Sequence, residues 1–174
     1  MVIKVLEALI SLIFFSNKIG FFLSRKNSIV WWMGAIAAVL AIYYFFLLHL
    51  FVYAIGEIGL FVITVYGALV KKENRKVEIG IECITFVIAV ILAFLTFQGQ
   101  LTVLEFFSSV GMLIAFYLLH PKNGMWKMKW GWVILAATHL TAAHIGYVKH
   151  QDMFAHFQIA SSIVGIGGAL KNGD

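Results

Sequence analysis

The stretch "YAIGEIGLFVITVYG", Tyr53–Gly67, decides the fold because a related stretch occurs a second time along the chain. It is apolar almost throughout, yet it carries Glu57. A shift of 101 residues lays it on "FAHFQIASSIVGIGG", Phe154–Gly168, and sets Glu57 opposite Gln158. The same shift, without a gap, also pairs identical residues, among them Trp31 with Trp132, His49 with His150, Ala54 with Ala155, Ile58 with Ile159 and Gly67 with Gly168. Self-similarity at a fixed spacing indicates an internal repeat.

The composition is that of a membrane protein. Of the 174 residues, 62% are hydrophobic and 12% are charged, and the mean hydropathy is +0.95. Soluble domains carry roughly 45–50% apolar and about 25% charged residues. The only cysteine, Cys83, lies inside a hydrophobic run, so no intramolecular disulfide is possible.

The chain divides into seven apolar runs, each close to the ~20 residues that cross a bilayer as a helix. We therefore expect an all-α membrane protein with seven transmembrane helices. The first run is too long for a signal peptide and lacks a small-residue cleavage site, so we interpret it as a membrane helix. The predicted spans are Ile3–Phe22, Ile29–Leu48, Phe51–Val70, Val77–Phe97, Leu101–Leu119, Trp130–Val148 and Met153–Leu170.

Basic residues predict the orientation. Ten of the thirteen lie in the first, third and fifth connectors or at the C-terminus, and three lie on the other side or in the first run. Cytoplasmic loops carry an excess of Lys and Arg, so we expect the N-terminus outside and the C-terminus in the cytoplasm. The net charge of +5 is confined to these short segments, which favours contact with anionic lipid over nucleic acid.

The repeat predicts a 3+1+3 arrangement of these helices. Residues 1–76 form a first three-helix bundle, residues 77–99 a linking transmembrane helix, and residues 100–174 a second three-helix bundle. The odd linking helix makes the two copies parallel. Parallel repeats are one of the known transporter plans, in which the substrate lies between the halves near the membrane midplane.

The stretch "WWMGAIAAVLAIYYFFLLHLFVYAIGEIGLFVITVYG", Trp31–Gly67, resembles the PnuC-type vitamin transporters, relatives of the SWEET sugar transporters. The family typically shows a Trp, a Gly three residues later, and a closing Tyr-Gly preceded by a Gln, whose position here is Glu57. Trp132, Gln158 and Gly168 fit the second half. Two expected Asn residues are missing, with Ala37 in the first half and Thr138 or His139 in the second, and the chain is shorter than typical members.

The resemblance implies a three-plus-one-plus-three fold, often trimeric, in the inner membrane. It implies facilitated uptake of nicotinamide riboside or a related vitamin, which later phosphorylation retains in the cell. On this interpretation the protein is a carrier and not an enzyme, and it needs no cofactor, since no nucleotide-binding motif or nucleophile–base pair is evident.

Glu57 and Gln158 are the first candidate binding residues. Glu57 lies six residues into its predicted span, about 9 Å from the outer end. A charged group facing lipid costs at least ~2.5 kcal/mol, so Glu57 should face protein or a water-filled cavity. It contacts a substrate or a proton, or it is a hydrogen-bonded carboxyl between helices. Gln158 suits amide or ribose hydroxyl groups, or it bonds a neighbouring helix.

Trp31, Trp132 and His139 complete the predicted substrate site. The two tryptophans open their spans at the cytoplasmic boundary, where they either join an aromatic belt or line the pore and stack on a ring. His139 shares a helix face with Trp132 and forms a binding wall, or it is a buried neutral histidine. We expect no metal site, because the histidines do not share a face at ligand spacing. We expect Lys18 to extend to the headgroups.

A carboxylate in place of the family's Gln favours a cationic vitamin, such as nicotinamide riboside or thiamine. Two alternatives remain: a SWEET-like sugar or nucleoside carrier, and a non-transporting membrane scaffold or sensor. A water-accessible pocket lined by Glu57 and Gln158 would favour transport, whereas a dry, tightly packed interface between the repeats would favour a scaffold.

Overall fold

The computed structural model describes residues 2–24, 28–69, 74–119 and 124–171, and within these ranges the regular structure is entirely helical. The all-α prediction is confirmed. Four of these helices, α2, α4, α5 and α7, are long and apolar enough to cross a membrane, and α3 contains a shorter apolar stretch. The helices are α1 (Val2–Ser24), α2 (Ser28–Leu47), α3 (Phe51–Leu69), α4 (Arg75–Leu95), α5 (Gln100–Leu118), α6 (Met125–Val148) and α7 (Asp152–Lys171).

The main difference from the predicted spans is at α6, which begins at Met125 and not at Trp130. The segment "MWKMK" counts as a connector by hydropathy, yet Met and Lys are good helix formers, so the helix continues through it. Trp132 therefore lies two turns inside α6 instead of opening the helix.

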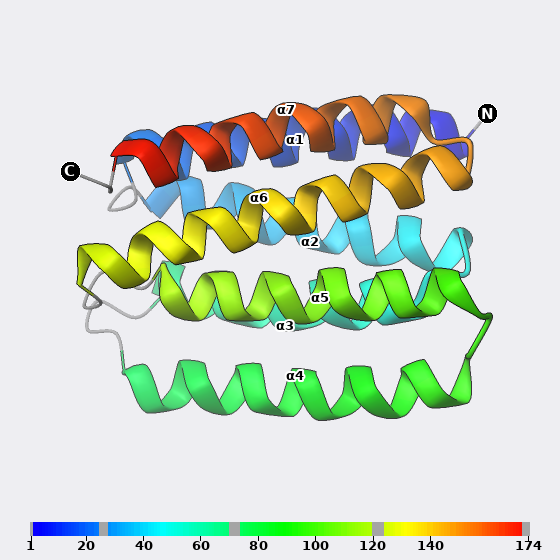
Figure 1. Cartoon of the computed structure of the whole chain (residues 1–174), viewed down its shortest axis with the longest axis horizontal. Helices are drawn as coiled ribbons and strands as arrows, with labels where there is room; N and C mark the ends of the chain where they lie inside the picture. The colour runs from blue at the N-terminus through cyan, green and yellow to red at the C-terminus, as the bar shows by residue number, and fades with distance from the viewer. Residues whose placement is uncertain (1, 25–27, 70–73, 120–123, 172–174) are drawn as a thin grey trace.

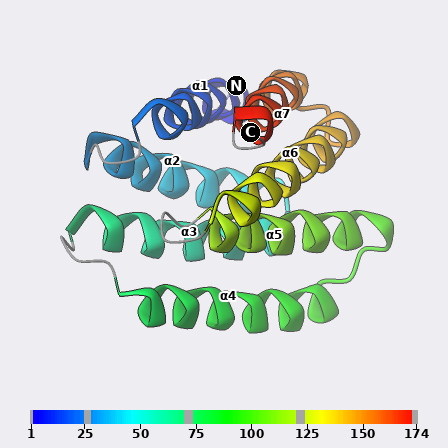
Figure 2. The ribbon, with the colours of Figure 1, turned by 60° about the vertical axis from the view of Figure 1, so that its left-hand side comes forward.

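The helices run side by side along the long axis of the molecule (Figure 1). Helix α4 lies at the edge and packs against α3 and α5 (Figure 2). Among the described residues, the backbones of the first three helices approach those of the last three most closely in two pairs, α1 with α7 and α3 with α5. The turns after α2, α4 and α6 lie at one end of the molecule, which we call the turn end. The opposite end, where α2, α4 and α6 begin, we call the far end.

The turns after α2 and α6 have the same backbone structure. His49 and His150 adopt positive φ angles of 56° and 54°, a left-handed conformation that is uncommon outside glycine. In both turns the following amide donates to the carbonyl five residues back, from Leu50 N to Phe45 O at 2.9 Å and from Gln151 N to Gly146 O at 2.8 Å. This is the Schellman helix ending, repeated at a spacing of 101 residues.

Two buried glutamates hold the first turns of α3 and α7, each from the other half of the chain. Glu7 of α1, 1% exposed, accepts a hydrogen bond from the Phe154 amide of α7 at 3.0 Å. Glu105 of α5, 3% exposed, lies at the backbone amides of Val52 and Tyr53 in the first turn of α3, which interact favourably with its carboxylate. The first amides of a helix lack partners within the helix and carry positive partial charge, so a carboxylate there is stabilising. We call this pair of contacts the crossed caps.

We expect that removing a crossed cap destabilises the protein, whereas removing only the ion pair beside the cap does not. Glu7→Leu removes the acceptor and strands a buried amide, so we expect a loss of about 1–3 kcal/mol. Glu7→Gln keeps an acceptor oxygen and should cost less. Thermal unfolding in detergent measures both changes.

The matched control is Lys4→Met. Lys4 Nζ lies 2.9 Å from Glu7 Oε2, but the lysine side chain is 60% exposed. Exposed ion pairs contribute about 0–1 kcal/mol, so this variant should melt close to the wild type. A melting temperature lowered equally by Lys4→Met and Glu7→Leu would assign the stabilisation to the ion pair instead.

Candidate functional site

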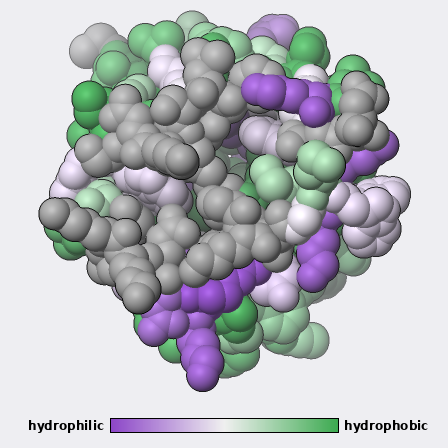
Figure 3. Space-filling view, turned by 90° about the vertical axis from the view of Figure 1, so that its left-hand side faces the viewer, coloured by the Kyte–Doolittle hydropathy of each residue, from purple (hydrophilic) through white to green (hydrophobic). Residues whose placement is uncertain are grey.

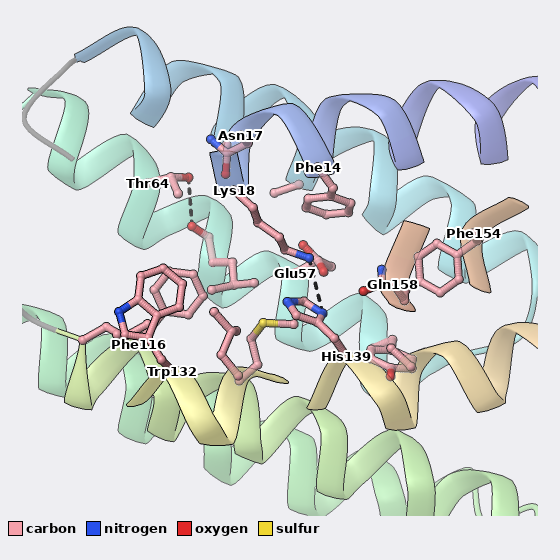
Figure 4. A pocket seen from close by; sticks show the side chains of 18 of the residues that line it. Phe14, Asn17, Lys18, Glu57, Thr64, Phe116, Trp132, His139, Phe154 and Gln158 are labelled. Carbon is pink, nitrogen blue, oxygen red and sulfur yellow. Dashed lines mark hydrogen bonds between the residues drawn. The ribbon is translucent and has the colours of Figure 1, made fainter. Parts of the chain in front are cut away.

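A cavity of about 300 Å³ lies between the two halves of the chain. Its described lining comes from α1, α2 and α3 on one side and from α5, α6 and α7 on the other, and none of it comes from α4. Figure 4 shows its side chains converging from both sides. The volume is at the lower end of the range typical of small-molecule sites, about 300–1,000 Å³.

Many of the lining residues are pairs at the repeat spacing. Helices α2 and α6, and α3 and α7, correspond at 101 residues, whereas α1 and α5 correspond at 98, as the two capping glutamates also do. The paired lining positions are Phe14 with Met112, Lys18 with Phe116, Gly34 with Leu135, Ala38 with His139, Tyr53 with Phe154 and Glu57 with Gln158. The backbone positions therefore correspond across the cavity, while most of the side chains differ.

Four of the five residues predicted from the sequence line this cavity: Glu57, Trp132, His139 and Gln158. Trp31 is not among the lining residues and is buried within α2, so its predicted contact with a substrate is not supported. At the depth of Trp31, helix α1 covers the start of α2. Asn17 of α1 lines the cavity and donates from Nδ2 to Val30 O at 2.6 Å.

Helix α6 supplies the predicted wall. Its lining residues are Met128, Trp132, Leu135, His139 and Ala142, which share one helix face at spacings of four and three. The Trp132 ring lies directly against Gly168 of α7, where a Cβ atom would overlap the indole. Close approach of these two helices thus sets the position of the ring that faces the cavity.

Lys18 is the lining residue that the sequence analysis assigned wrongly. It does not extend to the headgroups: its Nζ atom lies 3.3 Å from His139 Nδ1 and 5.9 Å from the centre of the Phe14 ring, and it points toward Glu57 (Figure 4). Side chains of a helix lean toward the N-terminus, which for α1 is the turn end, so the lysine stem leads inward. The neighbouring polar residue Asn17, in the same apolar run, is the feature of the sequence that could have indicated that this part of α1 faces a polar cavity.

The centre of the cavity holds buried polar atoms without a hydrogen-bond partner among the described residues. They are Glu57 Oε2, His139 Nε2 and Gln158 Oε1, on residues that are 5%, 1% and 7% exposed. Buried polar atoms in folded proteins nearly always have a partner, either from the protein or from water. The arrangement can therefore bind a polar ligand through hydrogen bonds.

The two ends of the cavity differ. Toward the turn end it is closed by the rings of Phe45, Tyr53 and Phe154, with centroids 4.9 Å apart for Phe45–Tyr53 and 5.8 Å for Phe45–Phe154. Toward the far end the lining includes Lys171, an exposed residue at the end of α7. Figure 3 faces this end and shows hydrophilic side chains, in purple, on its surface. The cavity thus extends to the far end.

In comparisons with family models, curated proteins and solved structures, nothing matches the chain. The class is defined by the fold and the cavity themselves. The chain is an all-helical protein with helices able to cross a membrane and a central, partly polar cavity between corresponding helices.

The contact between Trp132 and Gly168 predicts that Gly168→Ala is destabilising. The added methyl group overlaps the indole, so α6 and α7 must separate or the ring must shift, at a cost of about 1–3 kcal/mol. Gly167→Ala is the matched control, because nothing lies within 4 Å of its Cβ position. Alanine is the better helix former, so this variant should be neutral or up to about 1 kcal/mol more stable. Equal melting temperatures for the two variants would contradict the close approach.

Proposed function

We propose that the protein is a multi-pass inner-membrane carrier that takes up nicotinamide riboside or a related vitamin or nucleoside by facilitated diffusion. The observation that carries the proposal is the cavity between corresponding helices, which contains Glu57 and Gln158 at equal depth and buried polar atoms that have no hydrogen-bond partner in the described part of the chain. A scaffold would be expected to pack this interface tightly. The proposed substrate follows from the resemblance to the PnuC-type family and from the size of the cavity.

The proposed topology is the 3+1+3 arrangement with the N-terminus outside and the C-terminus in the cytoplasm. It is supported by the distribution of basic residues and by the matching turns at His49 and His150. In this orientation the turn end faces outward and the far end faces the cytoplasm. The aromatic rings then close the outward end of the cavity and its described lining extends toward the cytoplasmic end, which fits one state of an alternating-access carrier. From the family resemblance, we also propose that the protein assembles as a homotrimer.

Ligand binding tests the substrate class. Thermal unfolding of the purified protein is measured with nicotinamide riboside, thiamine, riboflavin, a neutral nucleoside and glucose. A ligand that binds only the folded protein stabilises it by about 2.7 kcal/mol at a ligand concentration of 100 times Kd, and this raises the melting temperature. Uptake of the binding ligand into proteoliposomes then tests transport. We expect a riboside or vitamin to bind; binding of glucose alone would favour the SWEET-like alternative.

Gln158→Leu should lower uptake by at least about 10-fold, because it replaces a hydrogen-bonding group at the cavity centre with an apolar one, at a cost near 1.4 kcal/mol in the bound state. Ser162→Ala is the control, since Ser162 is buried on the same helix but does not line the cavity. Equal uptake by the two variants, or absence of any ligand-dependent shift and uptake, would overturn the proposal.

A further inference from the structure

Lys18 occupies the centre of the cavity together with Glu57, although the two lie on different helices. Its ammonium group lies 3.3 Å from His139 Nδ1 and interacts electrostatically with Glu57. Both side chains point into the space between the halves (Figure 4). No direct ion pair joins Lys18 to Glu57 within the described part of the chain, so each charge is available to a ligand placed between them.

The charges at the cavity centre sum to zero. Glu57 is the acidic residue in the described lining, and Lys18 is the basic residue that lies near it. The other lining lysine, Lys171, follows Gln158 by thirteen residues on α7, about 20 Å along the helix. A carboxylate taken out of water without an opposite charge is strongly destabilising, and Lys18 supplies that charge from within the protein.

The contact with Lys18 also fixes the hydrogen-bonding role of His139. An ammonium group only donates, so Nδ1 of the imidazole accepts, and the proton of the neutral ring lies on Nε2. Counting partners among the described residues, the centre then presents one unpaired donor, His139 Nε2, and two unpaired acceptors, Glu57 Oε2 and Gln158 Oε1. A complementary ligand donates two hydrogen bonds and accepts one.

We infer that Lys18 is the resident counter-ion of Glu57 and determines the charge of the substrate, so that the cavity centre selects a ligand of zero net charge. This inference rests on the proposed carrier function for its ligand. It narrows the proposed substrates from nicotinamide riboside to related ribosides or vitamins of zero net charge, and it replaces the expectation of a cationic vitamin, which considered Glu57 without Lys18. Two hydroxyl groups of a ribose can donate to Glu57 and Gln158, and a carboxamide or carboxylate oxygen can accept from His139.

Chemical rescue tests the counter-ion without any substrate. Lys18→Ala removes three methylene groups and the ammonium, which together have the shape of n-propylammonium. We expect this variant to melt below the wild type and n-propylammonium to raise its melting temperature by about 2–4 °C, since the cation binds the vacated space. The neutral analogue 1-propanol is the control and should have no such effect.

The double variant Lys18→Ala/Glu57→Gln decides whether Glu57 is the partner. Without the carboxylate, the vacated space has no charge to attract a cation, so n-propylammonium should not raise its melting temperature. Rescue of the double variant to the same extent, or no rescue of Lys18→Ala, would overturn the counter-ion assignment.

Three ribosides of nearly the same shape test the charge selection. Nicotinamide riboside is a cation, dihydronicotinamide riboside is neutral, and nicotinic acid riboside is a zwitterion of zero net charge. We expect the wild type to bind the latter two at least about 10-fold more tightly than the first. Lys18→Met, which leaves Glu57 unbalanced, should reverse this order. Tighter binding of the cation by the wild type would overturn the inference.

The two tests separate the inference from the proposed function. If none of the three ribosides binds while n-propylammonium rescues Lys18→Ala and not the double variant, the riboside carrier proposal fails and the counter-ion stands. If the ribosides bind without regard to charge and rescue is absent, the carrier proposal stands and the counter-ion fails.

Discussion

The crossed caps are the contact on which the geometry of the cavity depends. Glu7 binds the first turn of α7 and Glu105 binds the first turn of α3, so each half of the chain anchors a helix of the other half. Because both anchors act at the turn end, α3 and α7 start at the same level, and Glu57 and Gln158, six residues later in each helix, reach the same depth. Burial strengthens these contacts, because electrostatic interactions with a charged group are stronger in the low dielectric of the protein interior than in water.

Sequence patterns were sufficient for the helices and for four residues of the cavity lining. Apolar runs of membrane length gave six of the seven helix starts closely, because hydropathy falls sharply at their polar connectors. The 101-residue repeat identified Glu57 and Gln158, since two polar residues in corresponding apolar runs are rarely accidental. The start of α6 was placed too late because hydropathy does not register that Lys and Met continue a helix as well as apolar residues do.

The remaining errors concern side-chain direction, which spacing along the chain does not contain. Lys18 was assigned to the lipid headgroups because it lies near a helix end, yet the lean of its side chain toward the N-terminus leads it to His139. Trp31 corresponds to Trp132 in the repeat, but Asn17 and Lys18 of α1 line the first half of the cavity there. A repeat predicts which backbone positions correspond, whereas the neighbouring helix decides which of them are exposed to the cavity.

The difference between paired lining positions bears on how a molecule can lie in the cavity. Corresponding backbone positions would offer an asymmetric molecule two equally good placements, related by exchange of the halves. Ala38 opposite His139, and Lys18 opposite Phe116, give the two walls unlike chemistry. On the proposed function, a bound molecule therefore has one preferred orientation, with its polar groups at His139 and its apolar part toward Phe116. If the protein is the carrier we propose, its duplicated backbone thus forms a site that distinguishes the two ends of its substrate.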